Sequence, residues 1–167
     1  MRVLGVDPGT IRMGYGVVED DNETPVALDY GAIAAPERSP IGERLLVLYK
    51  RLNEIVKRYR PEILAVEQPF ISKNPRSALA IGRAQAVAIL VAAANGVAVR
   101  EYTPAQVKQR VASYGASSKE QVQEMVRLQL RLPQVPEPDD AADALAIALC
   151  HIGERHFSQL VGKGTKS

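Results

Sequence analysis

Apolar positions in the first forty residues occur in short runs that glycine and proline interrupt. Residues 3–6 are apolar apart from one glycine, residues 15–19 contain β-formers, and residues 26–34 mix β-formers with polar residues. Branched and aromatic side chains favour strands, while intervening Gly and Pro favour turns. The pattern predicts three short strands with tight links, arranged as an antiparallel meander.

From residue 41 onward, helical and strand patterns alternate. Leu45, Leu48 and Leu52 belong to an apolar stripe within residues 41–59, which predicts a helix. The remaining expected elements are a strand over 63–67, a helix over 77–94 closed by Asn-Gly, a strand over 97–102, and helices beginning at Thr103, Ser118 and Asp139. Thr103, Ser118 and Asp139 are expected as N-caps.

This order of elements predicts an α/β fold, a five-stranded mixed sheet flanked by helices. The chain has 167 residues, of which 46% are hydrophobic, enough to form one sizeable core. We expect one domain over residues 1–157 and a disordered C-terminal tail over residues 158–167. In such sheets, ligands bind beyond the carboxyl ends of the strands.

Two acidic residues end predicted strands. Asp7 closes the first strand just before Pro-Gly, and Glu67 closes the strand over 63–67. A turn explains Asp7 alone, and an exposed strand end explains Glu67 alone. If the two strands are neighbours, however, both carboxylates meet at one edge, and such a pair requires a metal or a shared proton.

Further acids lie at the start of the last predicted helix. Asp140 and Asp143 are three residues apart and therefore share a face. Stabilisation of the helix N-terminus explains Asp139 and Asp140, but not Asp143, which lies among Ala and Leu. Oxygen ligands alone suit Mg²⁺ or Mn²⁺, and two such ions roughly 3.5–4 Å apart support phosphoryl chemistry. His151 and His156 are not needed and are expected at the surface.

Three motifs together resemble the RuvC family of Holliday junction resolvases. They are VLGVDPG at residues 3–9, AVEQPF at 65–70 and DAADALA at 140–146, in family order and spacing over nearly the whole chain. The resemblance implies a ribonuclease-H-like fold and a homodimeric, magnesium-dependent endonuclease. It would resolve four-way DNA junctions by paired symmetric nicks, leaving 5′-phosphate and 3′-hydroxyl ends. It also implies a role in recombination and DNA repair beside a branch-migration complex of RuvA- and RuvB-type proteins.

The resemblance assigns roles to particular residues. Asp7, Glu67, Asp140 and Asp143 fall on the family's four metal-binding positions, with the Asp-Ala-Ala-Asp spacing favouring Asp140 over its neighbour. Phe70 either packs under its own loop or stacks on an unpaired junction base, and the resemblance favours stacking. The other residues expected to bind DNA are basic: Lys73, Arg76, Lys108 and Lys119.

Composition narrows the alternatives. The net charge is only +2, but without the four proposed ligands fifteen acids remain against twenty-one Lys and Arg, an excess of six. A single cysteine and no signal-peptide pattern favour a cytoplasmic protein, and the longest apolar run, residues 86–94, is too short to cross a membrane.

Three other functions agree less well with the sequence. Residues 7–10 resemble a phosphate loop of two-lobed ATPases, but the chain is too short for two lobes. A ribonuclease-H-like nuclease of RNA maturation would share the first motif, but Phe70, the basic residues that follow it and the Asp-Ala-Ala-Asp motif favour a junction nuclease. A junction-binding scaffold without cleavage would have no reason to keep the acids.

Overall fold

The computed structural model describes residues 1–21, 23–69, 74–113 and 115–164. In these segments the chain forms β1 (Arg2–Asp7), β2 (Arg12–Glu19), β3 (Val26–Ala34), α1 (Ile41–Tyr59), β4 (Ile63–Glu67), α2 (Pro75–Ala94), β5 (Ala98–Tyr102), α3 (Pro104–Ala112), α4 (Lys119–Gln129) and α5 (Asp139–Gly164). The sheet order is β3-β2-β1-β4-β5, antiparallel from β3 to β1 and parallel from β1 to β5. The predicted meander and the five-stranded mixed sheet are therefore confirmed.

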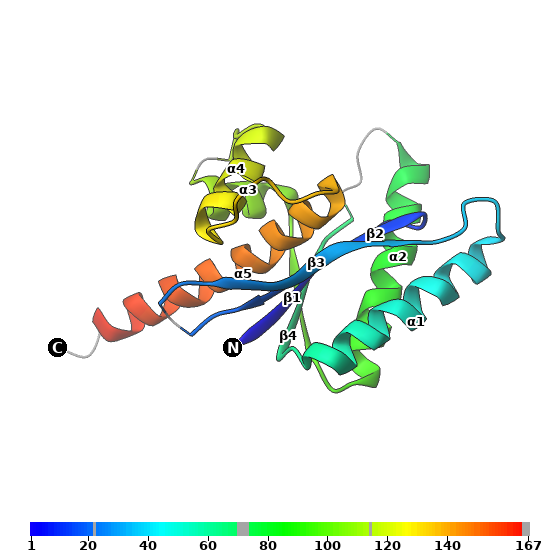
Figure 1. Cartoon of the computed structure of the whole chain (residues 1–167), viewed down its shortest axis with the longest axis horizontal. Helices are drawn as coiled ribbons and strands as arrows, with labels where there is room; N and C mark the ends of the chain where they lie inside the picture. Colours follow the sequence, from blue (N-terminus) through cyan, green and yellow to red (C-terminus); the bar gives the residue numbers. More distant parts are fainter. Residues whose placement is uncertain (22, 70–73, 114, 165–167) are drawn as a thin grey trace.

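Helices cover both faces of the sheet (Figure 1). One apolar cluster joins the sheet to α1 and α2, and the other joins it to α3, α4 and α5. Strand residues alternate between the two clusters: Leu4 and Val6 of β1 belong to the first, and Val3 belongs to the second. Odd-numbered positions of β1, including Asp7, consequently face α5.

Helix α5 lies unusually close to β1 and β2 because glycines face it. A Cβ atom added to Gly5 would lie 1.9 Å from the carbonyl oxygen of Ala144, and one added to Gly14 would lie 2.0 Å from that of Asp140. At Gly16 the added atom would lie 2.7 Å from the Leu145 side chain. Helix backbone therefore lies against Gly5 and Gly14, where no residue with a Cβ fits without movement of the helix, and the Leu145 side chain lies against Gly16.

Helix α2 is the one described helix that is long and apolar enough to cross a membrane by length and composition. One third of that span is buried within the protein, and the buried positions pack into the cluster shared with α1. Leu79 and Leu90 remain 56% and 60% exposed. The high apolar content of α2 therefore has two sources, a face that packs in the core and a face that is exposed.

Capping residues determine where several helices begin. Thr103 and Ser118 are N-caps with complete capping boxes, formed with Gln106 and Gln121, as their residue types predict. Asp139 was expected as the N-cap of the last helix, but it is the first helical residue of α5. Its carboxylate accepts a hydrogen bond from Gln123 of α4 and pairs with a lysine described below.

The C-terminal part of α5 differs from expectation. The predicted disordered tail began at residue 158, whereas the helix continues to Gly164. Phe157, Leu160 and Val161 are exposed on this last part, and Arg110 of α3 lies over the Phe157 ring. Helical hydrogen bonding therefore persists beyond the last residues that pack in the core.

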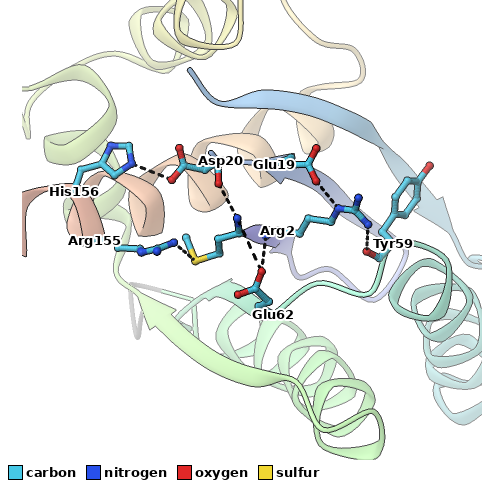
Figure 2. A network of polar contacts seen from close by, with 8 residues as sticks. Arg2, Glu19, Asp20, Tyr59, Glu62, Arg155 and His156 are labelled. Atoms are coloured by element: carbon cyan, nitrogen blue, oxygen red, sulfur yellow. Dashed lines mark hydrogen bonds and ion pairs between the residues drawn. The ribbon is translucent and has the colours of Figure 1, made fainter. Parts of the chain in front are cut away.

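The two histidines of α5 are not simple surface residues, contrary to the prediction. His151 is buried, with Nδ1 2.7 Å from the hydroxyl of Tyr102, because α5 is covered by α3 on that side. His156 is partly buried, and its Nε2 lies 2.9 Å from a carboxylate oxygen of Asp20, whose side chain is fully buried (Figure 2). These contacts hold the C-terminal half of α5 on the sheet.

The contact at Gly14 yields a stability prediction. Gly14→Ala should lower the free energy of unfolding by at least about 1–3 kcal/mol. The added methyl group would meet helix backbone rather than a flexible side chain. Gly153→Ala in α5 is the control, since a Cβ there meets nothing within 4 Å and alanine favours the helix. Urea unfolding measures both, and equal stability of the two variants would contradict this account of the packing.

Candidate active site

Two carboxylates lie together at the carboxyl edge of the parallel strands. β1 and β4 are neighbours, with Val6 opposite Val66, so Asp7 and Glu67 occupy equivalent strand ends. Ala65 belongs to the α5 cluster, so Glu67, two residues further on, faces the same side of the sheet as Asp7. The sequence prediction that these two acids share one edge is confirmed.

The first turn of α5 brings two more carboxylates to this edge. Asp140 lies over Gly14, and Gly14 pairs with Asp7 across the β1–β2 ladder. Asp143 is three residues further along the helix, and its charge acts on both Asp7 and Glu67. The four predicted acids therefore form one cluster, built from β1, β4 and α5.

Burial and mutual repulsion disfavour ionisation of this cluster. Burial, followed by the charges of Asp143, Glu67 and Asp140, raises the pKa of Asp7 to about 8. Burial also raises the pKa of Glu67, and Asp143 adds to the effect. For Asp143, burial raises the pKa more than nearby Lys119 lowers it. These groups lack sufficient positive charge nearby, which a bound cation would provide.

Three basic side chains border the acids. Lys119 Nζ, at the start of α4, lies 3.2 Å from a carboxylate oxygen of Asp139 and 3.5 Å from one of Asp143. Arg12 Nε, at the start of β2, lies 3.3 Å from a carboxylate oxygen of Asp140. Lys108 of α3 lowers the pKa of Glu67, although burial dominates there. The three acids at the start of α5 are thus paired with cations, and all three other proposed ligands raise the pKa of Asp7.

The donor set fits a hard divalent cation. All four groups are carboxylates, and two lie on rigid strand ends while two lie on one helix turn. Over the part of the chain that the structure describes, no three Asp, Glu, His or Cys side chains yet converge on one point. A single ion shared by three of these carboxylates would therefore require their side chains to move closer together.

Neighbouring elements support the cluster from behind. Gln85 of α2 is buried, and its Nε2 donates to the backbone oxygen of Glu67 at 3.4 Å and to Glu101 at 3.1 Å. In front of Glu67 and Asp143 is a cavity of about 230 Å³, which Lys108 and Lys119 also line. The acids thus face an accessible hollow edged by basic groups.

Of the five residues predicted to bind DNA, three lie in the part of the chain that the structure describes and two do not. Lys108 and Lys119 border the acid cluster, and Arg76 lies exposed in the first turn of α2, where Asn74 caps the helix by accepting from its backbone N–H. Phe70 and Lys73 lie outside the described residues. The loop that contains them leads from Glu67 to α2.

Two residues near the acids were missed by the sequence analysis, Arg12 and Gln85. Arg12 follows a glycine turn and reads as an ordinary surface arginine. Gln85 could have been noticed because it is a polar residue within the Ala-rich sequence of α2. A buried side-chain amide needs hydrogen-bond partners, so it indicates polar groups nearby.

Sequence comparisons place the chain among known nucleases. The family model for the crossover junction endodeoxyribonuclease RuvC matches residues 3–151. A protein of that name from Dehalococcoides mccartyi is 50% identical over 164 residues, covering 98% of each chain. Another, from Chloroflexus aurantiacus, is 53% identical over 151 residues, covering 90% of this chain and 92% of the relative.

Structural comparisons agree. RuvC of T. thermophilus, solved in complex with Holliday junction substrate, superposes with a TM-score of 0.89 at 36% identity, covering 95% and 96% of the two chains. The yeast mitochondrial Holliday junction resolvase shares the fold, with a TM-score of 0.66 at 14% identity and coverage of 97% and 85%. The architecture is thus that of the ribonuclease-H-like resolvases. Within this class, the chain belongs to the RuvC family of crossover junction endodeoxyribonucleases, which are metal-dependent.

The raised pKa of Asp7 predicts a pH-dependent stability. An unfolded aspartate has a pKa of about 3.9, whereas the pKa of folded Asp7 is about 8. The metal-free fold should therefore lose stability as pH rises between these values, because ionisation is disfavoured only in the folded state. Asp7→Asn should lack this loss and melt on the order of 5 °C higher than wild type at pH 8.

Melting temperatures in a chelator at pH 5.5 and pH 8 measure this effect. The advantage of Asp7→Asn should be smaller at pH 5.5, where wild-type Asp7 is protonated. Glu124→Gln, which changes an exposed acid on α4, serves as the control. Parallel pH dependences for Asp7→Asn and wild type would show that Asp7 is not held protonated.

Proposed function

We propose that this protein resolves four-way DNA junctions during recombination and DNA repair, cutting two opposing strands symmetrically. Four carboxylates at one sheet edge, in a chain of the RuvC family, are the observation that carries the proposal. Further support comes from the relative of 36% identity that was solved with Holliday junction substrate.

Asp7, Glu67, Asp140 and Asp143 are the proposed ligands of Mg²⁺, with Mn²⁺ as a substitute and two ions per site. Cations held there would activate the attacking water and stabilise charge on the phosphoryl oxygens. The fold fixes the backbone positions of these ligands, two at strand ends of the sheet and two in the first turns of α5. Because the pKa values of Asp7, Glu67 and Asp143 are raised, metal must displace protons from these acids, and metal affinity should rise with pH.

The proposed reaction is hydrolysis of one phosphodiester in each of two strands. The oxygen of water forms a bond to phosphorus, and the bond from phosphorus to the 3′ oxygen breaks. The 3′ oxygen takes a proton, which leaves a 3′-hydroxyl and a 5′-phosphate. Lys119 and Lys108 border the acids and would hold the charged backbone at this point.

The residues that we propose to bind DNA outside the metal site are Phe70, Lys73, Arg76, Lys108 and Lys119. The four basic residues would contact phosphates, which gives affinity without sequence reading. Phe70 would stack on an unpaired base near the crossover, because the loop that holds it begins directly beyond Glu67.

A homodimer is proposed through the exposed face of α2. Leu79 and Leu90 lie eleven residues apart, three helical turns, and both are more than half exposed. Small residues dominate the intervening helix, which permits close approach of a second copy. A two-fold axis would match the symmetry of a four-way junction and place one site on each of two strands. We further propose action in the cytoplasm, beside branch-migration proteins of the RuvA and RuvB type.

Cleavage of a synthetic four-way junction tests the proposed ligands. Wild-type protein should produce paired nicks that require Mg²⁺, with little cutting of linear duplex. Asp7→Asn should reduce cleavage at least about 10³-fold while junction binding persists, because the central ligand is lost and phosphate contacts remain. Gel assays of nicking and binding measure both quantities.

Glu124→Gln is the matched control, because it removes an exposed carboxylate of α4 outside the cluster, and it should cleave normally. Asp140→Asn should lose cleavage much more than Asp139→Asn, because only Asp140 is assigned as a ligand. Equal cutting of duplex and junction by wild type would contradict the proposed substrate.

Charge substitution on α2 tests the dimer. Leu79→Glu or Leu90→Glu should shift the protein to monomer in light scattering, because a carboxylate would be buried in the contact. Leu46→Glu is the control, since Leu46 of α1 is 51% exposed but lies outside this face. If α2 variants remain dimeric, the interface lies elsewhere.

A further inference from the structure

Arg12 pairs with one of the proposed metal ligands. Its Nε lies 3.3 Å from a carboxylate oxygen of Asp140, and its side chain is 53% exposed, against 32% for Asp140. It is the first residue of β2, directly after the turn that follows Asp7. The guanidinium therefore approaches the acid cluster from the side opposite β4.

The backbone of Arg12 is held by tight packing, while its side chain is half exposed and has the Asp140 ion pair. A Cβ on Gly9 would lie 2.2 Å from the Arg12 carbonyl oxygen, so only glycine allows this tight turn. The turn is also tied to the end of β3, where the backbone N–H of Ala35 donates to the carbonyl of Ile11 at 2.8 Å. The guanidinium can therefore change partners without any change in the fold.

An open hollow adjoins the pair. Its volume is about 840 Å³, and its lining includes Arg12, Lys119, Asp139 and Asp140. The two basic side chains stand on either side of the acids and contact different ones. A polyanionic strand entering this hollow would meet Arg12 next to the carboxylates that would hold metal.

The carboxylate of Asp140 cannot serve the guanidinium and a divalent cation equally well. A nearby divalent cation repels the guanidinium and competes for the same oxygen atoms. Released from Asp140, the guanidinium has the planar donor geometry that binds phosphate through two hydrogen bonds. The same side chain thus has one partner before metal binding and another afterwards.

We propose that Arg12 is a positioning residue that pairs with Asp140 in the metal-free protein and with a DNA phosphate in the metal-loaded complex. This inference rests on the proposed function and on Asp140 as a ligand. On this proposal Arg12 competes with metal for Asp140 and also helps to bind DNA. Removal of its side chain should therefore strengthen metal binding and weaken DNA binding. A merely structural role would weaken both.

Metal binding without DNA provides the first measurement. Mn²⁺ titration of the free protein, followed by calorimetry or electron paramagnetic resonance, should show about two- to fivefold tighter binding in Arg12→Ala than in wild type, as expected for loss of one exposed competing ion pair. Arg2→Ala is the matched control, because Arg2 pairs with Glu19 at the opposite end of β1. Unchanged or weaker Mn²⁺ binding by Arg12→Ala would overturn the proposal.

Junction binding provides the second measurement, with Ca²⁺ replacing Mg²⁺ to suppress cleavage. Arg12→Ala should bind the junction more weakly, and the slope of log affinity against log salt should fall by about one, as for one lost phosphate contact. Arg12→Lys should retain the slope while recovering only part of the affinity, because an ammonium lacks the planar pair of donors. An unchanged salt slope in Arg12→Ala would overturn the proposal.

Asp140→Asn separates failure of this inference from failure of the site. If Asp140→Asn weakens Mn²⁺ binding and Arg12→Ala does not strengthen it, the ligand assignment stands and the role of Arg12 is wrong. If Asp140→Asn leaves Mn²⁺ binding unchanged, Asp140 is not a ligand and the inference fails with it.

Discussion

The contact between α5 and the glycine positions of β1 and β2 sets the geometry of the whole molecule. Gly5 and Gly14 let the helix backbone lie directly against the strands, and Gly16 leaves room for the Leu145 side chain. Because the backbone of Asp140 lies over Gly14, and Gly14 pairs with Asp7, the packing contact and the proposed site involve the same residues. The separation of the carboxylates is therefore fixed by how closely a helix can approach a sheet.

The charges at the site oppose one another. Partial burial and repulsion raise the pKa values of the inner acids, so the cluster is destabilising without added positive charge. Lys119 and Arg12 supply part of this charge by pairing with acids of α5. These pairs are exposed on one side and hence weak, which allows a metal ion and a phosphate backbone to replace them.

Periodicity was sufficient to predict the sheet and most helices, because strands and helices here follow clear apolar patterns with Gly, Pro or capping residues at their ends. Asp7 and Glu67 could be placed together, since strand ends follow from sequence and neighbouring parallel strands share an edge. Arg12 could not be found in this way. Its role depends on a contact between residues 128 positions apart, and no local pattern distinguishes it from other surface arginines.

His151 shows a second limit of sequence reasoning. A histidine late in a helix reads as exposed, yet α3 covers this part of α5 and Tyr102 provides a partner for the imidazole. Burial of a polar group depends on which elements pack over it, and the short helices after β5 are placed by tertiary contacts. The C-terminal part of α5 was underestimated for a related reason, because helices can continue beyond their packed segment.

The glycine-lined contact also limits how such an enzyme can diverge. A change at Gly5 or Gly14 would move the helix and the carboxylates together, so evolution cannot adjust packing and ligand spacing separately. The basic side chains near the acids, Arg12, Lys108 and Lys119, come from the start of β2 and from the short helices α3 and α4, and none of them lies in the contact between α5 and the glycines. Differences in substrate preference should therefore accumulate at these basic residues, while the four carboxylates and the glycines that face α5 change little.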